Sequence, residues 1–222
     1  MNLILLGLPG AGKGTHARKL MKKYDMIHLS TGKLIRKTAR QNTSIGTVAR
    51  RYINEGKLVP DEIAVKLVRN KVMKFKEKDI IFDGFPRNIF QIQALEHILQ
   101  EIEENISLCI YLKVAEKNLI ERLQGRRICS YDGSIYHVKY NPPQTKGICD
   151  KCGGKLHHRK DDETGIIRKK IQENKKNIKI IRNYYRKKNI LKCIEATDKN
   201  PESVQNEIEN IIKNVDEKII NK

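Results

Sequence analysis

Apolar residues follow two spacings along this chain, and the two spacings alternate from one end to the other. Short runs of consecutive apolar residues are typical of strands buried on both faces of a parallel sheet. Such runs stand at residues 1–6, 26–29, 80–82, 107–112 and 190–194. Between them, apolar residues recur every three or four positions, as they do in helices that bury one side. The alternation predicts an α/β fold whose core is a doubly wound parallel sheet.

Helical spacing covers most of the chain between the predicted strands. It is found at residues 15–21, 45–55, 61–73, 89–103, 115–124, 166–187 and 201–220. A further short helix follows the second strand, where Ser30 or Thr31 can cap its first turn. Gly56 fits the position after a helix end, and Pro201 fits a helix start.

Two segments interrupt the core pattern. Residues 30–59 hold two small helices and too few apolar positions for a core of their own, so we expect a mobile flap. In residues 125–162 the helical spacing disappears, and turn-forming residues separate short β-prone pieces. We therefore predict a flap at 30–59, a small β-rich insertion at 125–162, and a core made of residues 1–29, 60–124 and 163–222.

The first predicted strand runs directly into a glycine-rich turn, Gly7-Leu8-Pro9-Gly10-Ala11-Gly12-Lys13-Gly14-Thr15. Strand, glycine-rich turn, lysine and helix together form the layout of a phosphate-binding loop. Glycines let successive N–H groups face one anion, the helix N-terminus adds partial positive charge, and Lys13 can reach the β- and γ-phosphates. A plain strand-to-helix turn is the alternative, which the three glycines, the lysine and the strand disfavour. Gly14 occupies the usual hydroxyl position, and Thr15 supplies a hydroxyl one residue later.

A second polar group follows the strand at 80–82. Asp83 begins the sequence Asp83-Gly84-Phe85-Pro86-Arg87, just past the carboxyl end of that strand. A carboxylate there faces the crevice of an α/β sheet and can hold Mg²⁺, directly or through water. Asp-Gly is also an ordinary turn signal. Arg87, on a stiff turn beside the same crevice, favours the functional interpretation.

Basic residues stand at the loops and insertion boundaries that point to this crevice. They are Lys13, Arg36, Arg87, Arg122, Arg126, Arg159 and Lys170. Each alone is expected on the surface, but their coincidence with the insertion boundaries favours binding of phosphates. The Lys/Arg run at 168–188 is interpreted as the solvated face of its helix, except at its first turn.

The formal charge of +19 at pH 7 raises the question of nucleic-acid binding. Lysine, isoleucine and asparagine are all abundant, a pattern that AT-rich coding sequence also produces, and phosphate-bearing substrates themselves require arginines. We therefore expect no nucleic-acid partner. No run of about 18 apolar residues occurs, so we expect no membrane span. Because the first strand leaves no room for a signal peptide, and five cysteines favour metal binding over disulfides, we expect a cytoplasmic protein.

Three of those cysteines and one aspartate have metal-ligand spacing: Cys129-x2-Asp132-x16-Cys149-x2-Cys152. This is the spacing of a four-ligand structural zinc site in which aspartate replaces one cysteine. Rival fourth ligands are His137, His157 and His158. Three reduced, metal-free cysteines are the alternative, and a nucleic-acid-binding zinc ribbon is another, but a ribbon does not explain the phosphate loop. Cys109, within a predicted strand, is expected in the core.

The GxPGxGKGT form of the phosphate loop resembles the nucleoside monophosphate kinases, and the adenylate kinases in particular. The resemblance extends through nearly the whole chain. It implies reversible phosphoryl transfer from MgATP to AMP, giving two ADP, by a monomer that carries a structural Zn²⁺ in its lid. The family's lid corresponds to residues 125–162, which we call the lid from here on. A zinc site would suit an insertion that lacks a core of its own.

Several motifs can be compared with the family position by position. Thr31 in Ser-Thr-Gly corresponds to a residue near the adenine of AMP, and Arg36 to one on its phosphate. Gln91, four residues after Arg87, suits adenine because an amide both donates and accepts hydrogen bonds. The resemblance assigns AMP binding to Thr31, Arg36, Lys57, Leu58, Val59, Gly84, Phe85, Pro86, Arg87, Gln91, Arg159 and Lys170.

On the ATP side, Gly125-Arg126-Arg127 resembles the opening of the lid, and Arg159-Lys160-Asp161-Asp162 its closing hinge. The resemblance assigns ATP binding to Gly10, Ala11, Gly12, Lys13, Gly14, Thr15, Arg122, Arg126, Ile135 and Tyr136. It assigns catalysis to Lys13, Asp83, Arg87, Arg126, Arg159 and Lys170, and zinc binding to Cys129, Asp132, Cys149 and Cys152.

Three positions depart from the family pattern. Lys170 stands where an arginine is usual, which replaces a bidentate fork by a point charge. Lys33 replaces a common aspartate near the water shell of the metal, and Gly165 a frequent glutamate. A kinase for another nucleoside monophosphate is an alternative that Gln91 and Thr31 disfavour. Outside this class, the alternative is a nucleic-acid-binding zinc protein that keeps an ATPase loop.

Overall fold

A five-stranded parallel sheet forms the centre of the molecule in the computed structural model, which describes residues 1–220 except the side chains of Lys160 and of residues 216–220. The strand order is β2-β3-β1-β4-β8, and every neighbouring pair is parallel. The strands are β1 (Asn2–Leu6), β2 (Ile27–Ser30), β3 (Ile80–Asp83), β4 (Ile106–Lys113) and β8 (Leu191–Glu195). The predicted parallel α/β core is confirmed.

The central strand β1 sets the position of the crevice. The strand pairs with β3 on one side and β4 on the other, and all five of its residues are buried, because helices cover both faces of the sheet. Leu5 pairs with Asp83 in β3 and with Ile110 in β4, so the carboxyl ends of these strands lie at one edge of the sheet. The direction in which strands are added reverses at β1, and ligand sites of such sheets lie at this reversal.

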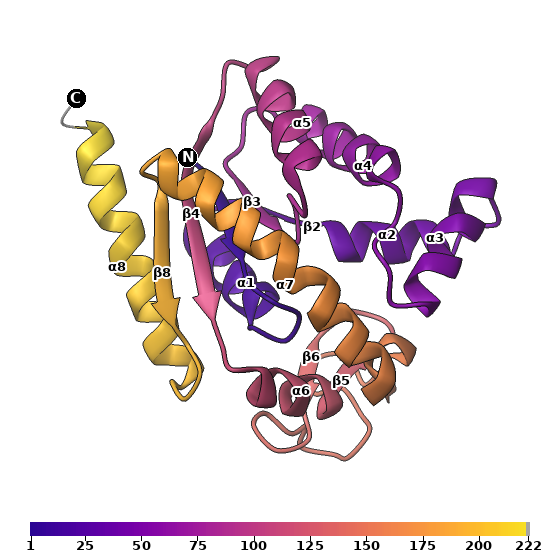
Figure 1. The fold of residues 1–222 in the computed structure, drawn as a ribbon. Helices are drawn as coiled ribbons and strands as arrows, with labels where there is room; N and C mark the ends of the chain where they lie inside the picture. Colours follow the sequence, from indigo (N-terminus) through magenta and orange to yellow (C-terminus); the bar gives the residue numbers. More distant parts are fainter. Residues whose placement is uncertain (221–222) are drawn as a thin grey trace.

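Helices cover both faces of the sheet. On one face, α1 (Lys13–Lys23) packs beside α8 (Pro201–Ile220), where His16 contacts Gln205. On the other face lie α4 (Asp61–Lys74), α5 (Ile89–Gln100) and the long α7 (Thr164–Lys187), which crosses in front of the sheet in Figure 1. The helix α6 (Glu116–Gln124) leads from β4 to the lid. Buried apolar residues of these helices and of the sheet form one continuous core.

The flap contains α2 (Thr31–Ala39) and α3 (Ser44–Asn54). Ser30 occupies the N-cap position of α2 but makes no capping hydrogen bond with its side chain, whereas Thr43 caps α3 by accepting a hydrogen bond from the Gly46 amide. Gly56 has φ of +72°, which ends the helical segment as predicted. A Cβ atom at Gly56 would lie 2.9 Å from Ile166 Cγ2, so the end of the flap touches the start of α7.

The lid is a separate three-stranded antiparallel sheet with the order β6-β5-β7, and it lies beside the N-terminal end of α7 (Figure 1). Its strands are β5 (Arg126–Cys129), β6 (Ile135–His137) and β7 (Leu156–His157). A short 3-10 helix, η1 (Lys160–Asp162), connects the lid to α7. The predicted β-rich insertion is therefore present as a small sheet of its own.

Two details refine the sequence-based prediction. The helix α5 ends at Gln100 rather than near residue 103, because Glu103 has φ of +56°, which a helix cannot contain. Cys109 is fully buried in β4, as predicted. In the part of the chain that the structure describes, no helix is both long enough and apolar enough to cross a membrane.

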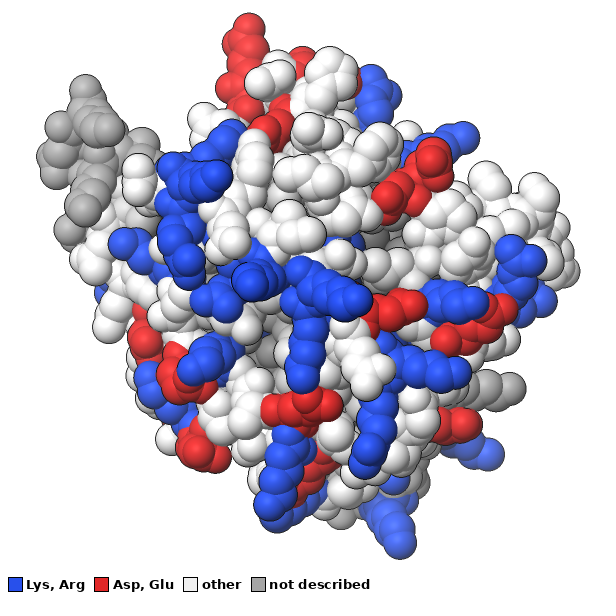
Figure 2. All heavy atoms as spheres, viewed as in Figure 1, with Lys and Arg blue, Asp and Glu red and all other residues white. Residues whose placement is uncertain are grey.

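The basic run of α7 is confirmed as a solvated face. Most of its lysines and arginines are exposed, and in Figure 2 they form a band across the face that α7 covers. Lys170, in the first turn of this run, is the predicted exception, because its side chain is half-buried and contacts Asp161.

Candidate active site and metal centre

The turn between β1 and α1 has the backbone geometry of a phosphate-binding loop. Gly10 and Gly12 have φ of +87° and +93°, which favour glycine, and a Cβ atom at Gly10 would lie 2.9 Å from the carbonyl oxygen of Leu119 in α6. Lys13, the first residue of α1, is buried, and its ammonium group donates hydrogen bonds to the carbonyl oxygens of Gly7 (2.8 Å) and Leu8 (3.0 Å). Lys13 is thus held across the loop.

Burial lowers the pKa of Lys13 to about 8, against the opposing effect of Asp83. The cations Arg87 and Arg126 lower this pKa further. A lysine whose charge is this poorly solvated gains strongly from an anion placed beside it. The environment of Lys13 therefore favours a negatively charged ligand.

Asp83 lies at the carboxyl end of β3, directly beside the phosphate loop. A Cβ atom at Gly14 would lie 3.3 Å from Asp83 Oδ2. This close approach explains the glycine in the usual hydroxyl position, since a larger side chain would crowd the carboxylate. Burial alone would raise the pKa of Asp83, but a 3.1 Å hydrogen bond with His28 and the charge of Lys13 lower it below its ordinary value. Asp83 is thus an ionised carboxylate among basic residues, and its role as a ligand of Mg²⁺ stays a prediction.

Arg87 is fixed by two contacts in the turn after β3. Its Nε donates to the carbonyl oxygen of Gly84 at 2.7 Å, and its guanidinium also contacts the amide oxygen of Asn174 in α7. Gly84 has φ of +82°, and a Cβ atom there would lie 2.9 Å from Arg87. Burial lowers the pKa of Arg87, partly offset by Asp83. The predicted stiff turn therefore aims a desolvated guanidinium at the crevice.

The lid contributes cations that are paired with acids of the hinge. Arg126 makes a bidentate contact with Asp162, at 2.8 Å through Nε and 2.7 Å through Nη2, and Asp162 is 1% exposed. Lys170 contacts both the carboxylate and the carbonyl oxygen of Asp161. Burial, and then the neighbouring cation Arg126, lower the pKa of half-buried Arg159 to about 9. Positive charge is thus concentrated where the lid meets the core.

These groups form one electrostatic cluster. Burial lowers the pKa of Arg36 in the flap, with further effects from Asp161 and Arg126 in the lid. The structure therefore brings flap, lid and core residues together, as the positions of the insertions predict. The cluster holds six cations and three carboxylates: Lys13, Arg36, Arg87, Arg126, Arg159 and Lys170, with Asp83, Asp161 and Asp162. Its excess positive charge suits a polyphosphate.

The residues assigned to AMP lie along the flap and the adjoining helices. Thr31 is 3% exposed, and its hydroxyl has no hydrogen-bond partner among the described residues. Gln91 is also buried, with both ends of its amide bonded within the protein. Val59 is buried, whereas Lys57 is exposed and pairs with Glu55 at 2.7 Å. The unpartnered hydroxyl of Thr31 is the clearest sign that a polar ligand belongs here.

The residues assigned to ATP lie in two places. Arg122 in α6 donates to the carbonyl oxygens of Ala196 (3.1 Å) and Thr197 (3.0 Å), and so joins the phosphate-loop side to the loop after β8. Tyr136 lies away from solvent in the lid, where its hydroxyl is 3.5 Å from Cys149 Sγ and accepts a hydrogen bond from the Asp150 amide. The contacts of Tyr136 are thus structural, and a role toward ATP stays a prediction, as it does for half-buried Ile135.

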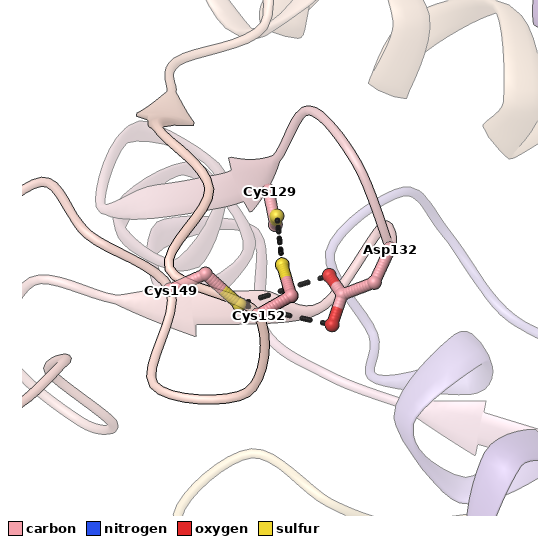
Figure 3. Close-up of side chains that lie close together, drawn as sticks. All are labelled: Cys129, Asp132, Cys149 and Cys152. Carbon is pink, nitrogen blue, oxygen red and sulfur yellow. Dashed lines mark hydrogen bonds between the residues drawn. The ribbon is translucent and has the colours of Figure 1, made fainter.

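The predicted metal ligands gather at the end of the lid sheet. Cys129, Asp132, Cys149 and Cys152 offer ligand atoms that all lie within 4.8 Å of one another (Figure 3). The Sγ atoms of Cys129 and Cys152 are 3.4 Å apart, and both carboxylate oxygens of Asp132 are 3.7 Å from Cys149 Sγ. A tetrahedral zinc ion with Zn–S bonds of about 2.3 Å requires ligand separations of about 3.8 Å. The donor set and its spacing fit one such ion.

Local structure supports this donor set. Two hydrogen bonds from Ser134 lower the pKa of Asp132 to about 2, which keeps it ionised. A Cβ atom at Gly154 would lie 3.0 Å from Cys129 Sγ, so only glycine leaves room for the cluster. Burial opposes ionisation of Cys149, but hydrogen bonds from Tyr136 and from backbone amides lower its pKa to about 7. The turns are therefore shaped for metal ligation.

The rival histidine ligands lie outside the cluster. His137 Nδ1 accepts hydrogen bonds from the backbone amides of Lys139 and Tyr140, and its Nε2 faces the carbonyl oxygen of Glu121. His157 contacts Ser130 through Nδ1. Within the described residues, the metal-ligand group contains neither these histidines nor His158.

Three residues of the site were not identified from the sequence. His28 contacts Asp83 from β2, which only the pairing of β2 with β3 reveals. Asp61, at the start of α4, accepts hydrogen bonds from the side chains of Gln91 and Asn88. Asn174 could have been found, since it lies four residues after Lys170 on the same predicted helix face.

Comparisons with known proteins agree with this geometry. The family model described as adenylate kinase matches residues 5–190. The adenylate kinase of Staphylococcus aureus is 43% identical over 198 residues, which cover 89% of this chain and 92% of the relative. The adenylate kinase of a Geobacillus species is 42% identical over 88% of this chain and 91% of its own length. That of Staphylococcus epidermidis is 41% identical over 96% of this chain and 99% of its own length.

Proposed function

This chain belongs to the adenylate kinase family, which transfers a phosphoryl group reversibly between ATP and AMP, and on that premise we propose how its residues share the reaction. The observation that supports this proposal most directly is that cations from the core, the flap and the lid lie together at the crevice beside Lys13 and Asp83. Transfer of a phosphoryl group requires positioning and charge stabilisation rather than a covalent enzyme intermediate. The cluster supplies both.

On the ATP side, the amides of the phosphate loop and Lys13 hold the β- and γ-phosphates. Arg126 and Arg159 cover the phosphates from the lid and exclude water from the transferring group. Arg122, already bonded to the loop after β8, lines the adenosine side. The short distance between Lys13 and the loop carbonyls supports this assignment, because phosphate oxygens there would lie within reach of the ammonium.

On the AMP side, Arg36 and Arg87 bind the phosphate, and Lys170 neutralises charge between the two nucleotides. Thr31 and Gln91 contact the base. The unpartnered, buried hydroxyl of Thr31 supports a ligand at this place. Residues 57–59 close over AMP as part of the flap, and residues 30–59 and 125–162 act as the two moving units.

Asp83 would hold the Mg²⁺ that the family's reaction uses with ATP. Its low pKa keeps it anionic, and it lies beside Gly14 and His28 at the end of β3. When bound, the ion supplies neutralisation of charge on the phosphates. Cys129, Asp132, Cys149 and Cys152 would hold one structural Zn²⁺, which has no part in the chemistry.

We further propose that the enzyme is a monomer that works in the cytoplasm. A reducing compartment would keep the three ligand cysteines free for zinc, and the substrates ATP and AMP are available there. Sedimentation at micromolar concentration would test the monomer, with a dimer as the contradicting result.

Base recognition is the sharpest test of the proposed roles. A coupled assay would measure ADP formation from ATP with AMP, CMP or UMP as acceptor. We expect AMP to be preferred, and Gln91→Leu to lower kcat/KM for AMP by a factor on the order of 10 without changing KM for ATP. Equal use of CMP or UMP by the wild type, or an unchanged kcat/KM in Gln91→Leu, would refute the assignment of Gln91.

A further inference from the structure

The side-chain amide of Gln91 is held at both ends by groups of opposite hydrogen-bonding character. Its Oε1 accepts a 2.8 Å hydrogen bond from the backbone amide of Arg87, and its Nε2 donates a 2.6 Å hydrogen bond to Asp61 Oδ1. A backbone N–H can only donate, and an ionised carboxylate can only accept. The chemistry of these two partners therefore permits one orientation of the amide and excludes the rotated one.

A second amide reinforces this arrangement. Asn88 Oδ1 accepts from the backbone amide of Gln91 at 2.9 Å, so its NH2 group must point the other way, to Asp61. There Nδ2 lies 2.9 Å from each carboxylate oxygen. Asp61 is also the first residue of α4, where the helix dipole favours a carboxylate. Two backbone N–H groups and one carboxylate thus fix the direction of every hydrogen bond in the network.

Adenine and the 6-oxo purines require opposite orientations of such an amide. On its Watson–Crick edge, adenine presents an amino donor beside the acceptor N1, whereas a 6-oxo purine presents a carbonyl oxygen beside an N1 that carries a hydrogen. After its bonds to Arg87 and Asp61, the amide of Gln91 keeps one lone pair and one hydrogen. In the fixed orientation the lone pair can accept from the adenine amino group, but it would face the carbonyl oxygen of a 6-oxo purine.

We propose that Asp61 is a positioning residue that sets the base specificity of the AMP site by preventing rotation of the Gln91 amide. The proposal rests on the proposed contact between Gln91 and the base of AMP. Asp61 does not touch the substrate. It makes the enzyme reject inosine and guanosine monophosphates, to which a rotated glutamine amide would be complementary.

The test compares AMP with inosine monophosphate, with ATP as the phosphoryl donor. Asp61→Asn has the same shape but can donate as well as accept, so it removes the restraint at Gln91 Nε2 and leaves the N–H of Arg87 as the remaining restraint on the orientation. We expect the ratio of kcat/KM for AMP to kcat/KM for inosine monophosphate to fall on the order of 10-fold. KM should rise for AMP and fall for inosine monophosphate, with little change in kcat. Asp61→Glu, which keeps an acceptor, should restore part of the ratio.

Two further variants complete the design. Glu62→Gln removes the same charge from the next residue, which is exposed, and should leave the ratio unchanged. Asn88→Ser keeps the capping oxygen but removes the donors to Asp61, and should lower the ratio by a smaller factor than Asp61→Asn. This variant also tests the proposal if Asp61→Asn does not fold.

The outcomes separate the inference from its premise. If Gln91→Leu lowers the ratio but folded Asp61→Asn and Asn88→Ser keep it, the positioning role is refuted and the contact of Gln91 with the base stands. If Gln91→Leu also keeps the ratio, both are refuted. A parallel fall in kcat/KM for the two substrates would show a merely structural role for Asp61 and would overturn the inference.

Discussion

The core sheet and the lid sheet are built on the same chain but are stabilised in different ways. In the core, β1, β3 and β4 are buried between two layers of helices, and their apolar side chains join one large cluster. In the lid, the corresponding cluster consists of Cys129, Tyr136 and Cys149, with Leu156 packed against it. Two of these residues are proposed metal ligands. Burial stabilises the core, whereas the lid, if it binds zinc as proposed, would depend on a small group of ligands.

The difference between the two sheets indicates which parts of the site are held rigidly by the core and which are carried by the lid. The core fixes Lys13, Asp83 and Arg87 on strand ends and helix starts, so their positions follow from the sheet. In the proposed function, the lid carries Arg126 and Arg159 on a unit that moves over the substrate. A metal ion can make a small unit rigid without attaching it to the core, because its bonds are all within that unit.

The largest expected effect in the core is on stability. Phe82 is fully buried in β3, and Phe82→Ala should lower the free energy of unfolding by about 3–5 kcal/mol. Phe90, which is half exposed in α5, provides the matched control, and Phe90→Ala should cost less than about 0.5 kcal/mol. Urea denaturation would measure both, and similar losses would contradict the assignment of the core. Zinc content should be the same in the two variants.

The next effect is on catalysis. Lys13→Met removes the charge at the phosphate loop and should lower kcat at least ~100-fold, by analogy with the loss of one oxyanion donor, with a smaller change in nucleotide affinity. Circular dichroism would establish that the variant is folded. Near-normal turnover in a folded Lys13→Met protein would refute the role of the loop.

A smaller effect is expected from the lid metal. Protein purified without added metal should carry close to one zinc per chain by elemental analysis. Asp132→Ala should weaken zinc binding at least ~10-fold in competition with a chromogenic chelator, whereas Asp132→Cys should preserve or tighten it.

Removal of the zinc should lower the melting temperature, while turnover at low temperature, where the lid is still folded, stays near its original rate. The absence of zinc would contradict the structural role, and so would chelation that abolishes catalysis without changing the melting temperature. Either result would remove the contrast between the two sheets.

The smallest effect is on the pH dependence of ATP binding. Lys13 has a pKa of about 8 without ligand, and adjacent phosphates favour its charged form, so binding above pH 8 requires uptake of a proton. Affinity for ATP should therefore change little up to pH 7, be about half its maximum at pH 8, and then fall by up to about tenfold per pH unit. Calorimetry in buffers of different ionisation enthalpy would measure the uptake. Lys13→Met should lack this dependence, and a flat wild-type profile would refute the low pKa.

Much of the fold could be predicted because its signals are local. The runs at 80–82 and 107–112 contain consecutive apolar residues that only a doubly covered strand can bury, and both lie within the observed strands. The spacing of Cys129, Asp132, Cys149 and Cys152 likewise identified a group that the structure brings together. The predicted end of α5 near residue 103 was wrong by three residues, because the positive φ of Glu103 is not compatible with a helix.

The pairing of charges could not be predicted, because it depends on the distance between segments that are remote in sequence. Arg126 was identified as a phosphate ligand, but its contact with Asp162 exists only because the lid strand β5 lies beside the hinge. The contact of Asp61 with Gln91 similarly requires α4 and α5 to be neighbours. Sequence pattern indicates which residues face the crevice but not which of them bind one another.

If Arg126 and Lys170 bind phosphate as proposed, the carboxylates of Asp161 and Asp162 make substrate binding an exchange of anions. Asp162 contacts Arg126 and Asp161 contacts Lys170, and both cations are assigned to phosphate. Because each carboxylate belongs to the same chain as its cation, its effective concentration is on the order of millimolar or above. A single orthophosphate ion must displace such an internal competitor on its own, whereas a nucleotide also gains contacts with the loop amides and the base site. On the proposed assignment, the hinge acids would protect the reaction from inhibition by free phosphate, and they would be available to displace each product when it leaves.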